Sequence, residues 1–267
     1  MCELLGMSAN VPTDLCFSVA GFLRRGGATG PHRDGWGIAF YEDDGYREFR
    51  DPHPSIESPI ARLICDYPIK SRIVISHIRQ ANVGAVNLGN THPFSRELWG
   101  RHWSYAHNGQ LDQSFATTLP LGLYHPTGTT DSEHAFCWLL DQIRQAFPEP
   151  PKEPRQLWDL IHQCCEQLRQ MGVFNMLLSD AQYLYGFCST KLVHITRRAP
   201  FGEARLMDME MTIDFSGCTT EHDVVTVVAT QPLTTNEAWT PFEAGELVIF
   251  QEGEVMGRRR SAGLGVI

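Results

Sequence analysis

The sequence has no long run of basic residues, and its formal net charge is -9. Nucleic acids and anionic membrane surfaces are bound through clustered Lys and Arg side chains. The triplet Arg258 to Arg260 is too short to provide such a cluster. We therefore expect neither a nucleic acid nor a membrane as the main partner.

Metal-binding and redox motifs are also missing. The eight cysteines include no C-x-x-C pair and show no disulfide-framework spacing, which argues against a zinc ribbon, a thioredoxin-like site or a disulfide scaffold. The eleven histidines include no H-x-x-x-H pair on a helix with a glutamate between them. We expect no metal site.

Targeting segments are absent as well. The N-terminus lacks the basic and long apolar regions of a signal peptide, and no uncharged apolar stretch of about 18 residues could cross a bilayer. Together with the cysteine pattern, this predicts a soluble protein of the reducing cytoplasm. An apolar fraction of 42% allows a full hydrophobic core. The Pro-rich stretch 148–154 joins two predicted helices, so we expect one domain over residues 1–267.

Segments rich in β-branched and aromatic residues recur along the chain and predict strands. They cover residues 35–40, 71–78, 102–107, 174–179, 183–188, 191–196, 223–230 and 246–251. Two central stretches instead have apolar residues at helical spacing. The first should begin near Asp131, where Thr130 and Glu133 form a capping-box pattern, and the second covers 154–172. A weaker helix candidate covers 59–67. This mixture predicts an α+β layered fold with antiparallel strands.

The chain opens Met-Cys, and removal of Met1 would leave Cys2 with both a thiol and a free α-amino group. Such a residue carries its own base, because an α-amino group has a pKa of about 8 and is partly neutral at physiological pH. The alternative is an ordinary buried thiol near a chain end. Position alone favours that alternative, so other residues must decide.

Three further places carry side chains suited to an amino-acid substrate. Arg79 follows an apolar strand, where its guanidinium either binds a carboxylate through two parallel hydrogen bonds or forms an ordinary ion pair. Asn108 and Gly109 form either a hairpin turn or an oxyanion hole, in which an amide and a backbone N–H point the same way. Asp131 either stabilises the first turn of a helix or binds a substrate ammonium.

The order of these motifs resembles the class II glutamine amidotransferase domain, an N-terminal nucleophile (Ntn) hydrolase. The resemblance rests on Met-Cys at the start, followed by DGWGIAFY, HIRQA, NTHPF, HNG and TDSE. It is closest to the stand-alone members of the family and covers most of the chain. It implies a four-layer αββα sandwich of two antiparallel sheets.

The resemblance also implies a role for each position. Cys2 would be the nucleophile, with its α-amino group as general base. Asn108 and Gly109 would form the oxyanion hole. Arg79 and Asp131 would bind the carboxylate and the ammonium of the substrate. No metal or organic cofactor is needed for this chemistry.

Two features separate this chain from the synthetases of the class. Their arginine is followed by Trp-Ala-Thr-His, whereas this chain has Gln80 to Val83, so the tryptophan associated with ammonia passage is replaced. The chain also ends soon after the glutaminase-like region, so any ammonia passed on would need a separate accepting enzyme. His92 matches a family position near the substrate, but we favour a role in ordering its loop through hydrogen bonds.

The predicted activity is hydrolysis of glutamine to glutamate and ammonia through a γ-glutamyl thioester. One alternative is an amidohydrolase that removes γ-glutamyl groups from a peptide or metabolite, because the γ-glutamyl head would be recognised in the same way. Another is a catalytically silent γ-glutamyl-binding or interaction module, which predicts a retained Met1 or an unreactive Cys2.

Overall fold

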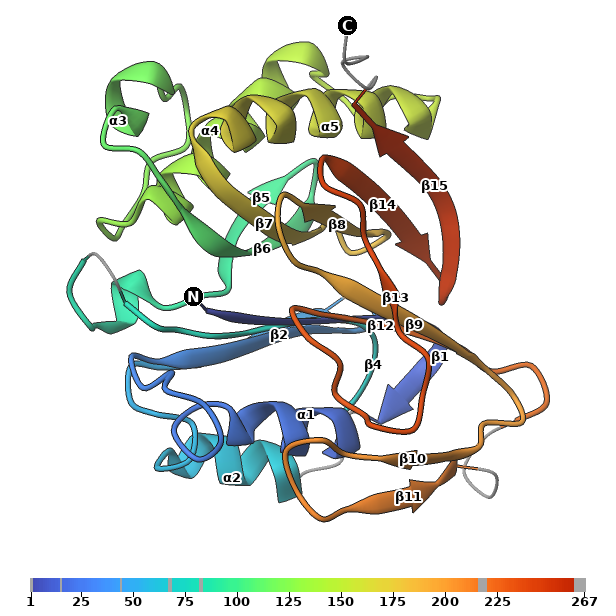
Figure 1. Cartoon of the computed structure of the whole chain (residues 1–267). Coiled ribbons are helices and arrows are strands. Elements are labelled where there is room, and N and C mark those ends of the chain that lie inside the picture. The colour runs from blue at the N-terminus through green and yellow to red at the C-terminus, as the bar shows by residue number, and fades with distance from the viewer. Residues whose placement is uncertain are drawn as a thin grey trace, which may run out of the picture.

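The computed structural model describes residues 2–14, 16–43, 45–66, 69–81, 84–215 and 220–261. Its helices are α1 (Cys16–Arg24), α2 (Pro59–Asp66), α3 (Phe115–Thr118), α4 (Asp131–Ala146) and α5 (Pro154–Gln170), with a 3-10 turn η1 (Leu88–Asn90). Two antiparallel sheets lie face to face, with α1 and α2 outside one and α4 and α5 outside the other (Figure 1). The predicted α+β fold with αββα layers is confirmed. No helix in the described part of the chain is long and apolar enough to span a bilayer.

The first sheet has seven strands in the order β13-β9-β12-β1-β4-β2-β3. They are β1 (Glu3–Asp14), β2 (Trp36–Glu42), β3 (Gly45–Asp51), β4 (Lys70–Ile78), β9 (Val193–Arg198), β12 (Val224–Ala229) and β13 (Thr240–Pro241). Strand β1 lies in the middle, paired antiparallel with β12 on one side and with β4 on the other. Cys2 therefore stands at the entrance to a central strand, and Arg79 directly follows the neighbouring strand.

The second sheet has six strands in the order β15-β14-β8-β7-β6-β5. They are β5 (Phe94–Leu98), β6 (Arg101–Leu111), β7 (Gly172–Ser179), β8 (Leu184–Cys188), β14 (Glu246–Gln251) and β15 (Glu254–Arg260). A separate two-stranded ribbon contains β10 (Glu203–Arg205) and β11 (Thr212–Asp214). Asn108 and Gly109 lie inside β6, opposite Asn175 and Phe174 of β7. The hairpin-turn interpretation of this Asn-Gly pair is therefore wrong.

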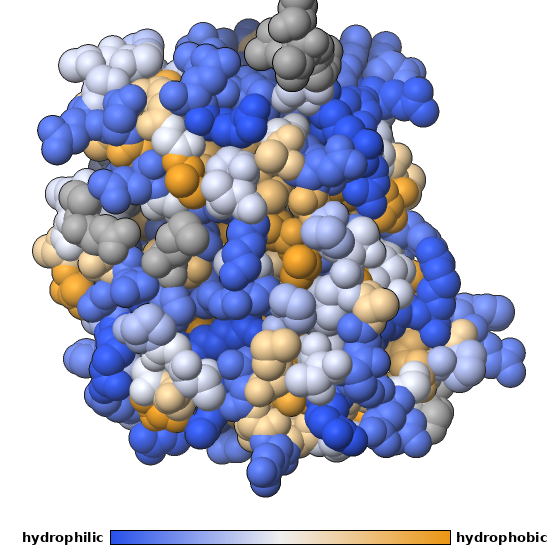
Figure 2. All heavy atoms as spheres, viewed as in Figure 1, coloured by the Kyte–Doolittle hydropathy of each residue, from blue (hydrophilic) through white to orange (hydrophobic). Residues whose placement is uncertain are grey.

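The helical stripes predicted from sequence pack against the second sheet. On α4, Phe136, Leu139 and Leu140 are fully buried, and full burial of such a side chain contributes about 1.5–3 kcal/mol. Between the two sheets lies a separate cluster that includes Leu4 and Leu177. On the face shown in Figure 2, hydrophobic residues form scattered groups among hydrophilic ones. Burial of these apolar side chains thus holds the two sheets face to face and brings β1 close to β6.

Helix α4 begins at Asp131, as predicted, and Thr130 caps it by accepting a hydrogen bond from the Glu133 backbone N–H at 3.2 Å. The reciprocal half of the predicted capping box is not observed. The Glu133 carboxylate instead accepts hydrogen bonds from the backbone N–H groups of Thr127 and Gly128. The Glu133 carboxylate also forms an ion pair with Arg96 at 2.6 Å, which favours this position.

Candidate active site

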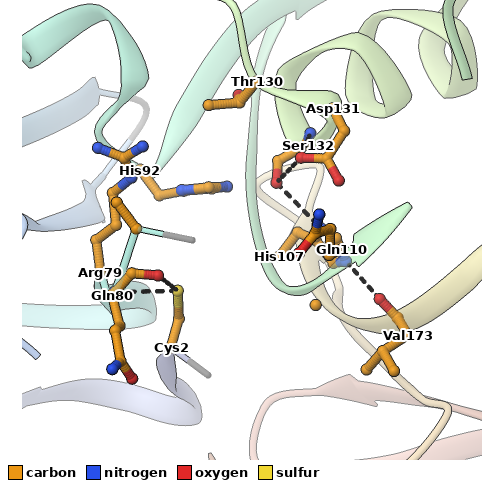
Figure 3. Close-up of a pocket in the computed structure, with 12 residues that line it drawn as sticks. Cys2, Arg79, Gln80, His92, His107, Gln110, Thr130, Asp131, Ser132 and Val173 are labelled. Atoms are coloured by element: carbon orange, nitrogen blue, oxygen red, sulfur yellow. Dashed lines mark hydrogen bonds between the residues drawn. The ribbon is translucent and has the colours of Figure 1, made fainter. Parts of the chain in front are cut away.

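Residues from both sheets and from the start of α4 enclose a cavity of about 240 Å³ (Figure 3). It is lined by Cys2, Arg79, Gln80, Ala81, His92, His107, Gly109, Gln110, Thr130, Asp131, Ser132 and Val173. The fold thus brings together five of the six residues predicted for the site. Asn108, the sixth, is not among the lining residues, although both of its neighbours in the sequence are.

The Cys2 thiol lies against the backbone of Gln80. The Gln80 N–H donates to Sγ at 3.3 Å, and Sγ lies 3.5 Å from the carbonyl oxygen of the same residue. Burial raises the pKa of the thiol, and the hydrogen bond from Gln80 lowers it by less, so the pKa of Cys2 stays above its ordinary value of 9.0. A thiol in this environment is protonated at neutral pH and needs a base before it can attack.

Arg79 and Asp131 stand on opposite walls of the cavity, with Cys2 on the side of Arg79 (Figure 3). The guanidinium of Arg79 donates from Nη1 to the Ala85 carbonyl at 3.1 Å. The carboxylate of Asp131 accepts from the Leu111 N–H at 2.7 Å and from the Ser132 N–H at 2.9 Å. Asp131 therefore belongs both to the first turn of α4 and to the cavity wall.

Gly109 is required where β6 approaches β7. A Cβ atom there would lie 1.7 Å from the Val173 carbonyl oxygen, so a side chain cannot be accommodated without moving the strand. Asn108, one residue earlier, is 1% exposed, and neither atom of its side-chain amide has a hydrogen-bond partner among the described residues. Burying an amide without partners is costly, so this site calls for a ligand or a functional explanation.

His107 lines the cavity and has no role predicted from the sequence, although it opens the HNG motif. Its Nε2 lies 3.1 Å from the Val173 carbonyl oxygen, and its Nδ1 lies 2.8 Å from Ser132 Oγ. Because a carbonyl only accepts, Nε2 carries the proton and Nδ1 accepts from the Ser132 hydroxyl. Burial lowers the pKa of His107, which is consistent with this neutral form. The ring therefore ties β7 to the start of α4 beside Asp131.

His92 lies in a stack of buried rings. Its ring centroid is 4.2 Å from that of His77 on β4 and 4.4 Å from that of Phe94 on β5. Neither ring nitrogen of His92 has a hydrogen-bond partner in the described part of the chain, and the same holds for His77. His92 is thus held by ring contacts rather than by the hydrogen bonds expected from the sequence, and one edge of it faces the cavity.

Neutral buried histidine should make the stability of the fold depend on pH. Burial, with a smaller contribution from the nearby charge of Arg79, lowers the pKa of His77 to about 3, from an ordinary value of 6.5. Between these values the unfolded chain binds a proton that the folded chain does not bind. The free energy of unfolding should therefore fall as the pH drops below 6.5, and each unit of pKa difference corresponds to about 1.4 kcal/mol.

Urea unfolding at pH 7.5, 5.5 and 4.5 measures this loss. His77→Leu should make the free energy of unfolding less dependent on pH, whereas replacing the exposed His125 with glutamine should not. If the free energy of unfolding depended on pH equally in the wild type and in His77→Leu, the lowered pKa of His77 would be contradicted.

Three residues discussed from the sequence, Met1, Asn82 and Val83, lie outside the described residues. The departure from the synthetase pattern is therefore located in the structure only at Gln80 and Ala81, which both line the cavity. Across the described ranges, His, Cys, Asp and Glu side chains form no group of three or more that could hold a metal ion.

Comparison with known proteins places this architecture in a family. The family model for class-II glutamine amidotransferases matches residues 1–264. The chain is 59% identical over 254 residues to YafJ of Escherichia coli K12, and the match covers 95% of this chain and 99% of that protein.

Solved structures agree. A predicted glutamine amidotransferase from Pseudomonas aeruginosa superimposes with a TM-score of 0.76 at 52% identity, covering 96% of this chain and 100% of that one. Glutamine phosphoribosylpyrophosphate amidotransferase from Bacillus subtilis superimposes with a TM-score of 0.61 at 14% identity, over 98% of this chain and 50% of that one, which shows a shared fold alone. This protein therefore belongs to the class II glutamine amidotransferases.

Proposed function

We propose that this protein hydrolyses the side-chain amide of glutamine to glutamate and ammonia, with Cys2 as nucleophile. The observation that carries the proposal is the composition of the cavity wall. A thiol, a guanidinium, a carboxylate and the backbone of Gly109 line a space of about 240 Å³. These groups match the reacting amide and the two charged ends of an amino acid.

The charged residues account for recognition of the substrate head. Glutamine carries an α-carboxylate, which suits Arg79, and an α-ammonium, which suits Asp131. Hydrogen bonds between ionised groups are roughly twice as strong as those between neutral groups. The two charged walls would therefore hold a zwitterionic amino-acid head in one orientation. Arg79 is 4% exposed, so its guanidinium would meet the carboxylate in a site that largely excludes water.

The proposed chemistry follows from the state of the thiol. Because burial raises the pKa of Cys2, the thiol is protonated before the reaction and needs a base. The free α-amino group of the same residue would take up this proton as Sγ attacks the amide carbon. The oxyanion is stabilised by the Gly109 backbone N–H and by the Asn108 amide, which has no competing protein acceptor in the described residues. The proton leaves with ammonia, and water then cleaves the γ-glutamyl thioester.

Covalent labelling with an electrophilic glutamine analogue, 6-diazo-5-oxo-norleucine, tests the proposal directly. Intact mass and peptide mapping should show that Met1 is removed and that one adduct forms on Cys2. An excess of glutamine should protect against labelling. Ammonia and glutamate should appear when glutamine is supplied alone.

Other outcomes would point elsewhere. A processed Cys2 that takes no adduct would reject the enzyme and favour a silent γ-glutamyl-binding module. Labelling without glutamine hydrolysis, but with cleavage of a γ-glutamyl anilide, would keep the nucleophile and move the substrate to a larger γ-glutamyl amide.

A further inference from the structure

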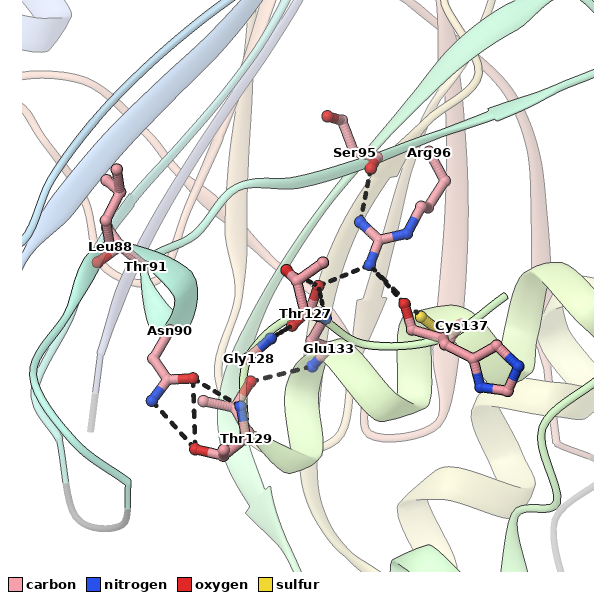
Figure 4. A network of polar contacts seen from close by, with 12 residues as sticks. Leu88, Asn90, Thr91, Ser95, Arg96, Thr127, Gly128, Thr129, Glu133 and Cys137 are labelled. Carbon is pink, nitrogen blue, oxygen red and sulfur yellow. Dashed lines mark hydrogen bonds and ion pairs between the residues drawn. The ribbon is translucent and has the colours of Figure 1, made fainter. Parts of the chain in front are cut away.

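A buried polar network lies beside the cavity and connects two loops (Figure 4). One loop, 84–91, follows the strand that ends before Arg79. The other, 127–130, leads into α4. Asn90 stands where they meet and is 1% exposed. Its amide is used fully, since Nδ2 donates to the Ala85 carbonyl at 3.0 Å and to Thr129 Oγ1 at 3.2 Å, while Oδ1 accepts from the Thr129 N–H at 2.8 Å.

On one side, this network reaches Arg79. The Ala85 carbonyl that accepts from Asn90 Nδ2 also accepts from Arg79 Nη1 at 3.1 Å. The buried amide and the guanidinium thus share one acceptor. Because Asn90 holds this carbonyl, the position of Asn90 limits where the guanidinium can lie.

On the other side, the network reaches Asp131. Thr129 is two residues before Asp131, and the intervening Thr130 caps α4. The loop 127–130 is also held by Glu133, which is fully buried and accepts from the Gly128 N–H at 2.7 Å. A Cβ atom at Gly128 would lie 2.4 Å from Asn90 Oδ1 and 2.5 Å from the Gly89 carbonyl oxygen. The loops 84–91 and 127–130 are therefore packed so closely that no side chain fits at Gly128.

We propose that Asn90 is a positioning residue that fixes Arg79 relative to Asp131 and thereby selects ligands with an α-amino-acid head. This inference rests on the proposed function, because it assumes that these two side chains bind the carboxylate and the ammonium. Asn90 lines no part of the cavity and acts only through Ala85 and Thr129. A purely structural role would instead affect every reaction of the site equally.

Two reagents that react with the same sulfur distinguish these roles. The electrophilic glutamine analogue needs both charged walls, whereas iodoacetamide has no amino-acid head. Asn90→Ala should lower the second-order rate of Cys2 labelling by the analogue about 10-fold to 100-fold, the scale of loss when a bound group is misplaced. Labelling of Cys2 by iodoacetamide, followed by peptide mapping, should keep its wild-type rate. With glutamine, KM should rise while kcat is largely retained.

The same loop offers a matched control. Asn87 is exposed, and its side chain accepts from the Asn90 backbone N–H at 2.9 Å, so it caps η1 and holds the backbone of Asn90 rather than its amide. Asn87→Ala keeps the bonds of the Asn90 amide to Ala85 and Thr129, so its labelling rate with the analogue should stay close to that of the wild type. If Asn90→Ala fails to fold, Thr129→Val removes one hydrogen bond of the bridge in a side chain of similar shape. It should show a smaller loss in the same direction, confined to the analogue.

The outcomes separate this inference from the proposed function. A wild-type protein that the analogue does not label overturns both. A wild-type protein that is labelled, with Asn90→Ala and Thr129→Val labelled equally fast, overturns the role of Asn90 alone. An equal loss with both reagents also overturns it, because the residue would then act on the nucleophile or on the fold.

Discussion

Replacement of Cys2 with alanine should lower glutamine turnover by about 10⁴-fold or more, because the covalent route through a thioester is lost. Release of glutamate at saturating glutamine measures this effect. Cys16→Ala is the matched control, since Cys16 is a partly exposed thiol at the start of α1 and does not line the cavity. Its turnover should equal that of the wild type.

The same variant should still bind glutamine. Arg79 and Asp131 are untouched by the substitution, so added glutamine should raise the melting temperatures of Cys2→Ala and of the wild type alike. Appreciable turnover by Cys2→Ala would contradict a thiol nucleophile. Loss of both turnover and binding would indicate that the substitution disturbs the start of β1 instead.

Asn108→Ala should lower kcat by about 10²-fold to 10³-fold, the usual cost of losing one oxyanion donor. The KM for glutamine should change little, because the charged ends of the substrate are bound elsewhere. The free energy of unfolding should also change little. The Asn108 amide has no partner in the described residues, so removing it breaks no hydrogen bond of the folded protein.

Asn175 is a matched comparison for Asn108, because its side-chain amide is also buried but forms several hydrogen bonds. It faces Asn108 across the β6–β7 pair and is also fully buried. Its Oδ1 accepts from three consecutive backbone N–H groups, those of Ser189, Thr190 and Lys191. Asn175→Ala should therefore cost about 2–4 kcal/mol of unfolding free energy, as expected when a buried network is broken.

Comparing the two variants by urea unfolding and by steady-state kinetics separates function from stability. If Asn108→Ala were as unstable as Asn175→Ala, its amide would be structural, and the oxyanion assignment would fail.

Sequence patterns predicted the interior strands better than the edge strands. Strands β6, β7, β8 and β14 were all predicted, and each has a neighbour on both sides. The edge strands β3, β5 and β15 were missed, because one side of each has no partner strand among the described residues and their sequences are rich in charged residues. A pattern based on apolar alternation is weakest in such strands. The central strand β1 was also missed, since it contains Gly, Asn and Pro.

The site shows a similar division between what a sequence can and cannot reveal. The order of short motifs, and the family that they resemble, predicted five residues of the cavity wall: Cys2, Arg79, His92, Gly109 and Asp131. The network behind them was not predictable, because its members are far apart in sequence. Asn90 and Thr129, for example, are separated by 39 positions, and the packing of two loops alone brings them together. Asn90 stands in the NTHPF motif, yet nothing local indicates its partners.

The central position of β1 sets an order of events during synthesis. Strand β1 leaves the ribosome long before its partner β12, which begins only at Val224. At about 5–20 residues per second, the ribosome needs on the order of ten seconds or more to make the intervening chain. Until then, the sheet around Cys2 has one side open. If Cys2 is the proposed nucleophile, we therefore expect Met1 to be removed during translation, before β12 pairs with β1.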